Sequence, residues 1–467
     1  MERRRLDHWE VLAWVLPGVA ILIAATATVD LAYLIEIGDR MIGSGAIIRR
    51  DVLTYTVAGA PWTNQPWGAS IVLSGIHSAV GWKGLVVSRA IIVSVCVGAT
   101  YRRTRRAGAD PIVAGCLVMG GFVCVAALPG ALALRPQLLV APLFVLTCWL
   151  LDPPRRSSAA VWAIVPVAIV WANLHGSFVL VPLLVAIAAI GELVARRPSA
   201  WRLVALFALT CAAPIVSPWG TATYAYVVEV TTSPIVRAID EWRPIMTRWP
   251  AGVAFAAACV GLAAILWRRA VRPVPLEPLL AIAVFTVLVL VSGRNVVWWG
   301  FVVPPAAGIV LAGWRVPTQI GSRPRLVVVG VLVALLAMGV LRVAAAPRGE
   351  TLLADVPTDL TSSLADRVDD GRIFAADFAG WFEYALPGTP MFVDPRVELF
   401  PSSVWDDFFA VATAAPGWGD VLARWDVTTV VVDPTVHPDL DRALKASGDW
   451  AMDYRDDRGA IFVRAGP

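Results

Sequence analysis

The chain has 467 residues, of which 58% are hydrophobic and only 16% are charged. Soluble domains carry about 25% charged residues, so the composition excludes an ordinary soluble protein and predicts a polytopic α-helical membrane protein. The net charge of +4 is small, and the arginines gather in short loops, which is typical of membrane topology and not of a nucleic-acid-binding surface. The six cysteines lie in apolar stretches, so we expect small core residues and not disulfides.

Membrane-spanning segments are the first elements that the sequence predicts, since a spanning helix needs about 20 apolar residues. The N-terminal apolar run lacks a small-residue cleavage site, so we expect an uncleaved first helix and not a signal peptide. A short, more polar run at 67–80 favours a re-entrant or interfacial helix. Eleven spans are predicted, at residues 10–29, 82–101, 110–128, 136–151, 159–175, 177–195, 200–216, 251–267, 276–292, 296–313 and 325–344.

The basic loops test this arrangement. MERRR, YRRTRR, PPRR, ARRPSAWR, WRRAVR and WRVPTQIGSRPR alternate along the chain so that all fall on one side of the membrane. The positive-inside rule makes that side cytoplasmic. We therefore expect a multi-pass membrane protein with a cytoplasmic N-terminus, and with outer loops at 30–66 and 217–250.

The tail after residue 345 has a different composition. Acidic residues become frequent, and RIFAADFAGWFEYAL, PMFVDPRVELF and VTTVVVDP alternate apolar stretches with turn residues. VWDDFFAVAT and PDLDRALKAS have the spacing of helices. We predict two domains: a transmembrane domain, 1–345, and a small extracytoplasmic α/β domain, 346–467.

The predicted outer loops hold most polar residues that topology does not explain. Ionisable groups near spans are costly and usually face a bundle interior or a wet cavity, so we expect these residues to converge in a cavity. Alternatives stay open, because several can instead cap helix ends or form surface pairs. The candidates for substrate binding in the later loops are Arg135, Asn173, His175, Glu241, Arg243, Arg294 and Asn295.

The first outer loop contains the candidate catalytic carboxylates. Glu36 and Asp39 share one face of a predicted amphipathic helix, whose opposite face is apolar. If that helix continues toward the N-terminus, Asp30 belongs to the apolar face, where burial suits a carboxylate to proton transfer. Asp30 can instead cap the helix or pair with Arg89. Asp51 is a second candidate, although its arginine neighbours also suit a solvated loop.

Arg89 is an unusual charge inside the second predicted span, about 10 Å below the outer surface at 1.5 Å per residue. A buried guanidinium needs an anion. Either Asp30 or the phosphate of a lipid substrate can supply that anion. In the tail, Asp394, Arg396 and Glu398 alternate on one predicted strand, which favours a structural row of ion pairs over a second active site.

Segment 27–45, followed by GAPWTNQPWGASIVL and GLVVSRAIIVS, resembles the start of bacterial membrane glycosyltransferases of the GT-C superfamily, in the branch of protein mannosyltransferases and aminoarabinose transferases. The ArgProGln, TrpAlaAsnLeuHisGly, GluTrpArgPro and GlyArgAsn segments also fit such proteins. Asp30 matches the catalytic-type Asp of that family, and Arg89 matches its span Arg. Leu31 stands where Glu is frequent, and Gln65 stands where Lys is frequent.

This resemblance implies an enzyme that transfers a sugar from a polyprenyl-phosphate donor to a glycan, lipid or protein acceptor at the outer face, with inversion and with Asp30 as general base. Membrane lipids are further expected partners, and nucleic acid is not. No metal-ligand spacing occurs and no cofactor is expected, although scattered carboxylates can hold a divalent cation. Two alternatives remain: a non-catalytic scaffold that binds a glycan or lipid carrier, and a transporter or flippase.

Overall fold

The computed structural model describes residues 8–26, 30–316, 322–354, 356–368 and 371–465. The MERRR cluster and residues 27–29, at the end of the first predicted span, lie outside the described residues. The chain forms two compact units. Unit 1 is drawn from Met1–Thr26 and Val80–Leu352, and unit 2 from Ala27–Ala79 and Leu353–Pro467. The first outer loop, which the sequence assigned to the transmembrane domain, therefore belongs with the tail.

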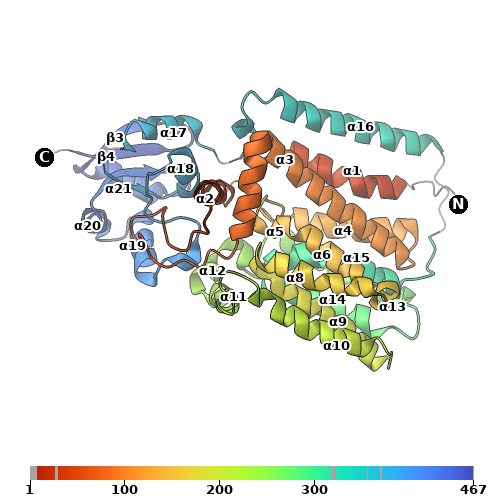
Figure 1. Cartoon of the computed structure of the whole chain (residues 1–467). Coiled ribbons are helices and arrows are strands. Elements are labelled where there is room, and N and C mark those ends of the chain that lie inside the picture. The colour runs from red at the N-terminus through yellow and green to blue at the C-terminus, as the bar shows by residue number, and fades with distance from the viewer. Residues whose placement is uncertain (1–7, 27–29, 317–321, 355, 369–370, 466–467) are drawn as a thin grey trace. The chain divides into compact units, whose positions relative to one another are not determined.

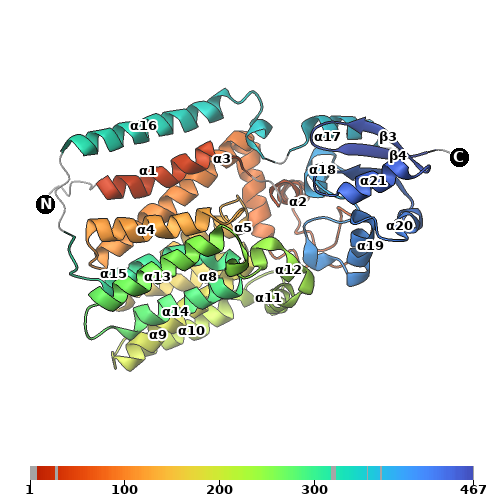
Figure 2. The same ribbon diagram turned by 180° about the vertical axis from the view of Figure 1, so that it is seen from behind.

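Unit 1 is a helical bundle in which each of the predicted spans overlaps a helix (Figures 1 and 2). Several spans begin or end in a 3-10 turn. The helices are α1 (His8–Ile23), the later part of α3 (Trp67–Arg106), α4 (Pro111–Ala126), α5 (Pro136–Leu139), α6 (Ala141–Leu150), α7 (Pro153–Arg156), η1 (Ala159–Ala163), α8 (Ile164–Ala172), η2 (Gly176–Val179), α9 (Leu180–Val194), α10 (Ala200–Ala212), η3 (Ala213–Ile215), α11 (Ala222–Thr232), α12 (Pro234–Ala238), η4 (Asp240–Trp242), η5 (Ile245–Thr247), α13 (Ala251–Arg269), α14 (Leu276–Val291), η6 (Gly293–Asn295), α15 (Val296–Val310), α16 (Ser322–Ala345) and η7 (Gly349–Leu352).

Three helices among the described residues are long and apolar enough to cross a membrane: Trp67–Arg106, Gly176–Val194 and Ala251–Arg269. Seven further apolar helices are shorter. The run at 67–80 forms the first part of α3, which consists of two helices joined across a kink at Gly81. Gly81 interrupts that helix with a φ of 62°, a left-handed conformation that glycine adopts without steric cost.

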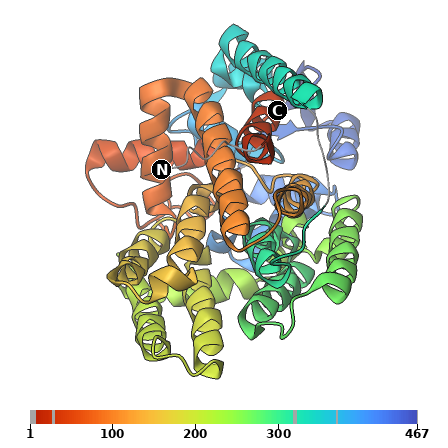
Figure 3. The same ribbon diagram turned by 90° about the vertical axis from the view of Figure 1, so that its right-hand side faces the viewer.

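Close packing explains how the bundle is held together. α15 contacts both α4 and α14, and α1 lies against α4 and α16 (Figure 3). Glycines permit the closest approaches, because a Cβ at Gly98 or Gly115 would overlap the rings of Trp14 and Trp9. Asp110 caps α4 by accepting a hydrogen bond from Ile112 N (3.0 Å), directly before a proline at the first helical position. All six cysteines are free thiols, as expected.

Unit 2 contains a four-stranded sheet in the order β1-β2-β4-β3. β1 (Arg372–Ala375) is parallel to β2 (Val427–Val432), and β4 (Ala460–Arg464) is antiparallel to both β2 and β3 (Trp450–Arg455). β2 consists of β-branched valine and threonine, which favour strands. The helices of unit 2 are α2 (Leu31–Ser44), the first turns of α3, α17 (Thr358–Ala365), α18 (Ala379–Ala385), η9 (Val397–Leu399), α19 (Ser402–Ala412), α20 (Trp418–Arg424) and α21 (Pro438–Ala446).

The first loop is joined to the tail through backbone hydrogen bonds. Met391 N donates to Leu53 O (2.9 Å), and Tyr55 N donates to Met391 O (3.1 Å). Met391 also forms a bridge with Ile373 of β1, so the loop extends the edge of the sheet. PMFVDPRVELF, expected as a strand, instead forms these isolated bridges and then η9. The predicted ion pair within it is confirmed for Asp394 and Arg396.

Candidate functional site

Three loops of unit 1 bring charged side chains together in what we term the Arg135–Glu241–Arg294 cluster. Arg135 Nη1 donates to Glu241 Oε2 over 2.6 Å, and Arg294 Nη1 lies 3.6 Å from Glu241 Oε1. The three side chains are 11%, 16% and 21% exposed. Arg135 and Glu241, which lie 106 positions apart, therefore converge with Arg294, as the sequence predicted for the polar groups of these loops.

Helix ends position this cluster. Arg135 is the extended residue before α5, and Pro136 fixes the first turn that follows it. Arg294 lies in the 3-10 turn η6, between α14 and α15. Arg294 Nε donates to Gln137 Oε1 (2.8 Å), and Gly293 N donates to Arg243 O (2.8 Å), which joins this turn to the Glu241 segment. The cluster is thus built on rigid helix ends.

Electrostatics give the cluster a net positive charge. Burial raises the pKa of Glu241, but the charges of Arg294 and Arg135 outweigh that effect and lower its pKa. Burial, together with the same two arginines, lowers the pKa of His175. Ser177 N donates to His175 Nδ1 (3.2 Å), so the neutral ring carries its proton on Nε2. Two guanidinium groups then face one carboxylate, which suits the binding of an anion.

Arg89 is buried in the same unit, with a residue exposure of 7%. Its Nε donates to Leu132 O (2.6 Å), and its Nη1 donates to the Thr26 hydroxyl (2.9 Å) and to Ala25 O (3.4 Å). Leu132 belongs to the loop that leads into Arg135. All these acceptors are neutral, and among the described residues Arg89 forms no ion pair.

Searches for related sequences and structures give different answers. No protein-family model and no curated protein matches the chain. Among solved structures, the archaeal oligosaccharyltransferase AglB from Archaeoglobus fulgidus, in complex with an inhibitory peptide and a dolichol-phosphate, is similar over 95% of this chain and 72% of that chain, with 12% identity and a TM-score of 0.52. ArnT from Cupriavidus metallidurans, bound to undecaprenyl phosphate, is similar over 98% of both chains, with 15% identity and a TM-score of 0.50.

The arabinofuranosyltransferase AftD from Mycobacteria is similar over 99% of this chain but only 42% of that chain, with 15% identity and a TM-score of 0.54. The chain has the fold of GT-C glycosyltransferases. The family resemblance noted in the sequence is thus confirmed at the level of the fold.

The two predicted catalytic carboxylates of this GT-C fold lie in unit 2. Asp30 directly precedes α2, is half-buried and makes no capping hydrogen bond with its side chain. The apolar face of that helix is buried, as predicted, but Glu36 is also buried and pairs with Arg40 at 2.6 Å. Asp51 is fully buried, and Arg396 Nη2 donates to its Oδ1 over 2.5 Å. These contacts are those of a structural ion pair.

Three other predicted residues lie outside the charged cluster. The Asn173 side chain donates to Ile169 O (2.8 Å) and Val216 O (3.0 Å), and Asn295 donates to Leu288 O (3.1 Å). Both amides therefore satisfy helix-end carbonyls. Arg243 is 51% exposed and lies 3.6 Å from Asp240.

Sequence reasoning missed Gln137 and Glu383. Gln137 orients Arg294, and its position two residues after Arg135 was the available signal. Glu383 is 2% exposed within the apolar run GWFEYAL, where a lone acid indicates an unusual environment. Within the described part of the chain, no group of three His, Cys, Asp or Glu residues is arranged to hold a metal ion.

Proposed function

We propose that the protein transfers a sugar from a polyprenyl-phosphate donor to a glycan, lipid or protein acceptor of the cell envelope, at the outer face of the bacterial plasma membrane and with inversion. The observation that carries this proposal is Arg89. A buried guanidinium that meets only neutral acceptors bears a charge that an incoming phosphate can neutralise.

The comparisons support a lipid-phosphate donor. AglB and ArnT, which share this fold, hold a dolichol-phosphate and an undecaprenyl phosphate. A donor with a long isoprenoid chain suits a reaction among membrane helices, because the chain can stay in lipid while its phosphate reaches polar groups. The guanidinium groups of Arg135 and Arg294 can donate charge-assisted hydrogen bonds to such a phosphate.

The proposed reaction assigns a role to each group. Asp30 takes the proton of the acceptor hydroxyl, whose oxygen attacks the anomeric carbon while the bond to the phosphate oxygen breaks. The leaving phosphate gains negative charge, which Arg89, Arg135 and Arg294 stabilise. Glu241 accepts a hydrogen bond from a sugar hydroxyl.

Other predicted residues have supporting roles in this proposal. Neutral His175 donates a hydrogen bond through Nε2 to the bound sugar or phosphate. Arg243, Asn173 and Asn295 shape the border of the site, while Asp51 acts through the packing of the first loop. No metal or cofactor is assigned a role in this scheme.

The test is sugar transfer by the reconstituted full-length protein, using a polyprenyl-phosphate sugar and a candidate acceptor. Asp30→Asn is expected to lower the transfer rate by about 10²- to 10⁴-fold, the usual contribution of a general base. Asp39→Asn is the matched control, because it removes a carboxylate of the adjoining helix α2 that accepts a hydrogen bond from Ser74. A folded Asp30→Asn protein with an undiminished rate would exclude Asp30 as the base.

The same assay separates the alternatives. If the wild-type protein binds the lipid-linked sugar but releases no product, it is a non-catalytic scaffold. If the lipid-linked sugar crosses sealed vesicles without being consumed, the protein is a transporter or flippase. Each of those results overturns the proposed enzyme.

A further inference from the structure

Unit 1 contains a cavity of about 520 Å³ at the end of the bundle where the arginine-rich loops lie. Its volume falls within the range of about 300–1,000 Å³ that is usual for small-molecule sites. One part of the wall is apolar and comes from α6, α9, α14 and α15. The rest is polar and comes from the end of α3, from α7 and from the start of α14. The apolar wall includes Leu151, Leu184, Ile187, Ala188, Val302 and Ala306.

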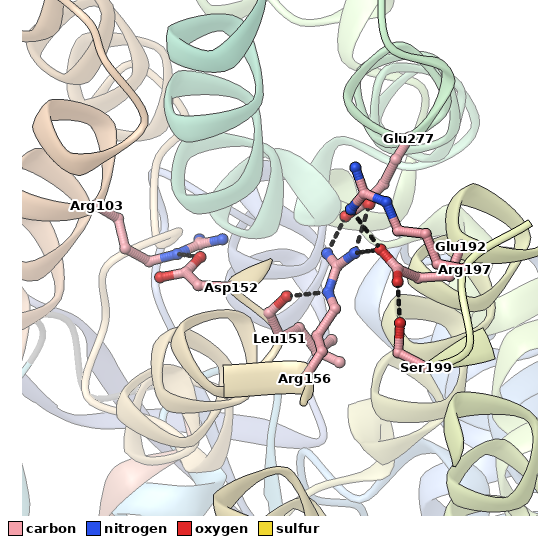
Figure 4. A network of polar contacts seen from close by, with 8 residues as sticks. All are labelled: Arg103, Leu151, Asp152, Arg156, Glu192, Arg197, Ser199 and Glu277. Carbon is pink, nitrogen blue, oxygen red and sulfur yellow. Dashed lines mark hydrogen bonds and ion pairs between the residues drawn. The ribbon is translucent and has the colours of Figure 1, made fainter. Parts of the chain in front are cut away.

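One side of the polar wall is electrically balanced (Figure 4). Arg156 is 4% exposed and binds both Glu277 and Glu192, with 2.7 Å from Nη1 to Glu277 Oε2 and 3.1 Å to Glu192 Oε1. Arg197 lies 3.1 Å from Glu192, and Ser199 donates a further hydrogen bond to that carboxylate. Two arginines thus face two glutamates, and this network closes the wall without leaving excess charge.

The other side of the polar wall is not balanced. Arg103 donates to Asp152 (3.0 Å), and Arg155 lies 3.6 Å from the same carboxylate. Two arginines therefore share one aspartate. Arg106 also lines the cavity, and it forms no ion pair with any described residue. Two positive charges are left uncompensated beside an apolar chamber.

Arg155 is held in place by an aromatic ring. Its guanidinium lies 3.5 Å from the centroid of the Trp149 ring, a stacking that reduces the number of conformations open to its long side chain. An arginine whose only role is to keep its loop on the cytoplasmic side needs to face water, and it needs no stacking on an aromatic ring. The cavity thus sets three arginines, Arg103, Arg155 and the exposed Arg106, against a single aspartate beside an apolar chamber. This combination is complementary to an amphiphile with an anionic head.

We propose that this cavity binds an anionic membrane phospholipid. Its phosphate would contact Arg103, Arg106 and Arg155, and part of an acyl chain would occupy the apolar chamber. This site is distinct from the proposed sugar-transfer site, since it uses none of the same residues. Such a lipid would fill the bundle between α3, α9 and α15 and stabilise their packing.

The test is lipid retention by the purified full-length protein, measured by native mass spectrometry during titration with phosphatidylglycerol or phosphatidylcholine. We expect phosphatidylglycerol to bind more tightly. Arg106→Gln and Arg155→Gln are each expected to weaken its binding roughly tenfold, as for the loss of one charge-assisted contact. Arg268→Gln is the matched control, because it removes an exposed arginine of α13 that does not line the cavity. Its affinity is expected to equal that of the wild type.

A second arm distinguishes a lipid from a free phosphate. Ala188→Phe fills part of the apolar wall and is expected to displace phosphatidylglycerol at least as strongly as Arg106→Gln, with retained folding checked by tryptophan fluorescence. Glycerol phosphate, which lacks the chains, is expected to compete weakly. Equal binding of both phospholipids, or equal losses in Arg106→Gln and Arg268→Gln, would overturn the site. Strong competition by glycerol phosphate would overturn the lipid as its occupant.

Discussion

Two clusters of arginine and carboxylate groups, one in each unit, use the same chemistry in opposite ways. In unit 2, Arg396 binds both Asp51 and Asp394, and all three side chains are at most 1% exposed. In unit 1, Glu241 is shared by Arg135 and Arg294, and these side chains remain partly exposed. The first cluster has an excess of acid and is closed, whereas the second has an excess of base and is accessible.

This difference is the one that we expect between a structural cluster and a cluster that binds an anion. Arg396 also lies 4.5 Å from the Trp62 ring centroid, and Asp51 accepts hydrogen bonds from the Thr54 backbone and hydroxyl. No external anion can approach such a site without displacing the packing around it. In unit 1, the side chains of Arg135, Glu241 and Arg294 remain partly exposed, so a phosphate can approach them. The predictions below test this contrast.

The largest effect is expected for Arg396→Met. The substitution would leave the carboxylates of Asp51 and Asp394 buried without their cation, and loss of one partner from a buried pair costs about 3–5 kcal/mol. Hydrogen exchange of the β2 amides in the full-length protein would measure the free energy of opening unit 2.

Arg424→Met is the matched control in the same unit. Arg424 binds Asp407 and is 57% exposed, so its loss is expected to change the opening free energy by less than about 1 kcal/mol. Equal exchange rates in the two variants would contradict the structural role of the closed cluster.

A smaller effect on stability, but a clear effect on binding, is expected for Arg135→Gln. Arg294 would still face Glu241, so we expect a loss of stability of only about 1 kcal/mol. Removal of one charge-assisted contact would weaken the binding of undecaprenyl phosphate roughly tenfold. The quenching of tryptophan fluorescence on titration with this lipid would report the affinity.

Arg237→Gln provides the comparison, because Arg237 belongs to the same loop as Glu241 but is exposed and donates to Thr231 O (3.0 Å). Its affinity is expected to stay within about twofold of the wild type, which corresponds to about 0.4 kcal/mol. The binding role of the cluster would be wrong if the two substitutions weakened affinity alike.

The helices of unit 1 could be predicted because their apolar runs are long and the arginine loops separate them. The convergence of Arg135, Glu241 and Arg294 followed from topology, since loops on one side of a membrane share one surface. Their pairing could not be predicted, because it depends on the reciprocal contact of Gln137 with Arg294.

Which segments of the chain pair to form unit 2 was harder to predict. The alternation of PMFVDPRVELF indicates a strand, yet the bridge of Met391 to Thr54 uses a partner more than three hundred residues away. Local patterns cannot specify such a partner. The neighbouring Arg49 and Arg50 suggested a solvated loop charge at Asp51, but Asp51 is buried and the arginine that it binds is Arg396.

The last prediction concerns the pH dependence of the closed cluster. Burial, followed by the negative charge of Asp394, raises the pKa of Glu383 well above its ordinary value. The folded protein therefore keeps a proton that the unfolded chain releases above about pH 4.3, so the stability of unit 2 falls as the pH rises from that value. In the wild type this loss is at most about 1.4 kcal/mol per pH unit. Glu383→Gln should remove it, because the amide does not titrate.

Thermal unfolding of wild type and Glu383→Gln between pH 5 and pH 8 would measure the difference. The raised pKa of His437 also lowers stability as the pH rises, but it acts in both proteins and cancels. If the stabilities of the two proteins changed with pH in parallel, Glu383 would not be protonated in the folded protein. Glu241→Gln should show the opposite sign, but only below about pH 4.3, because the arginines lower the pKa of Glu241 and its stabilising charge is lost as the pH falls below that value. A scan extended into that acidic range should therefore destabilise the wild type relative to Glu241→Gln, and parallel curves there would contradict the lowered pKa of Glu241.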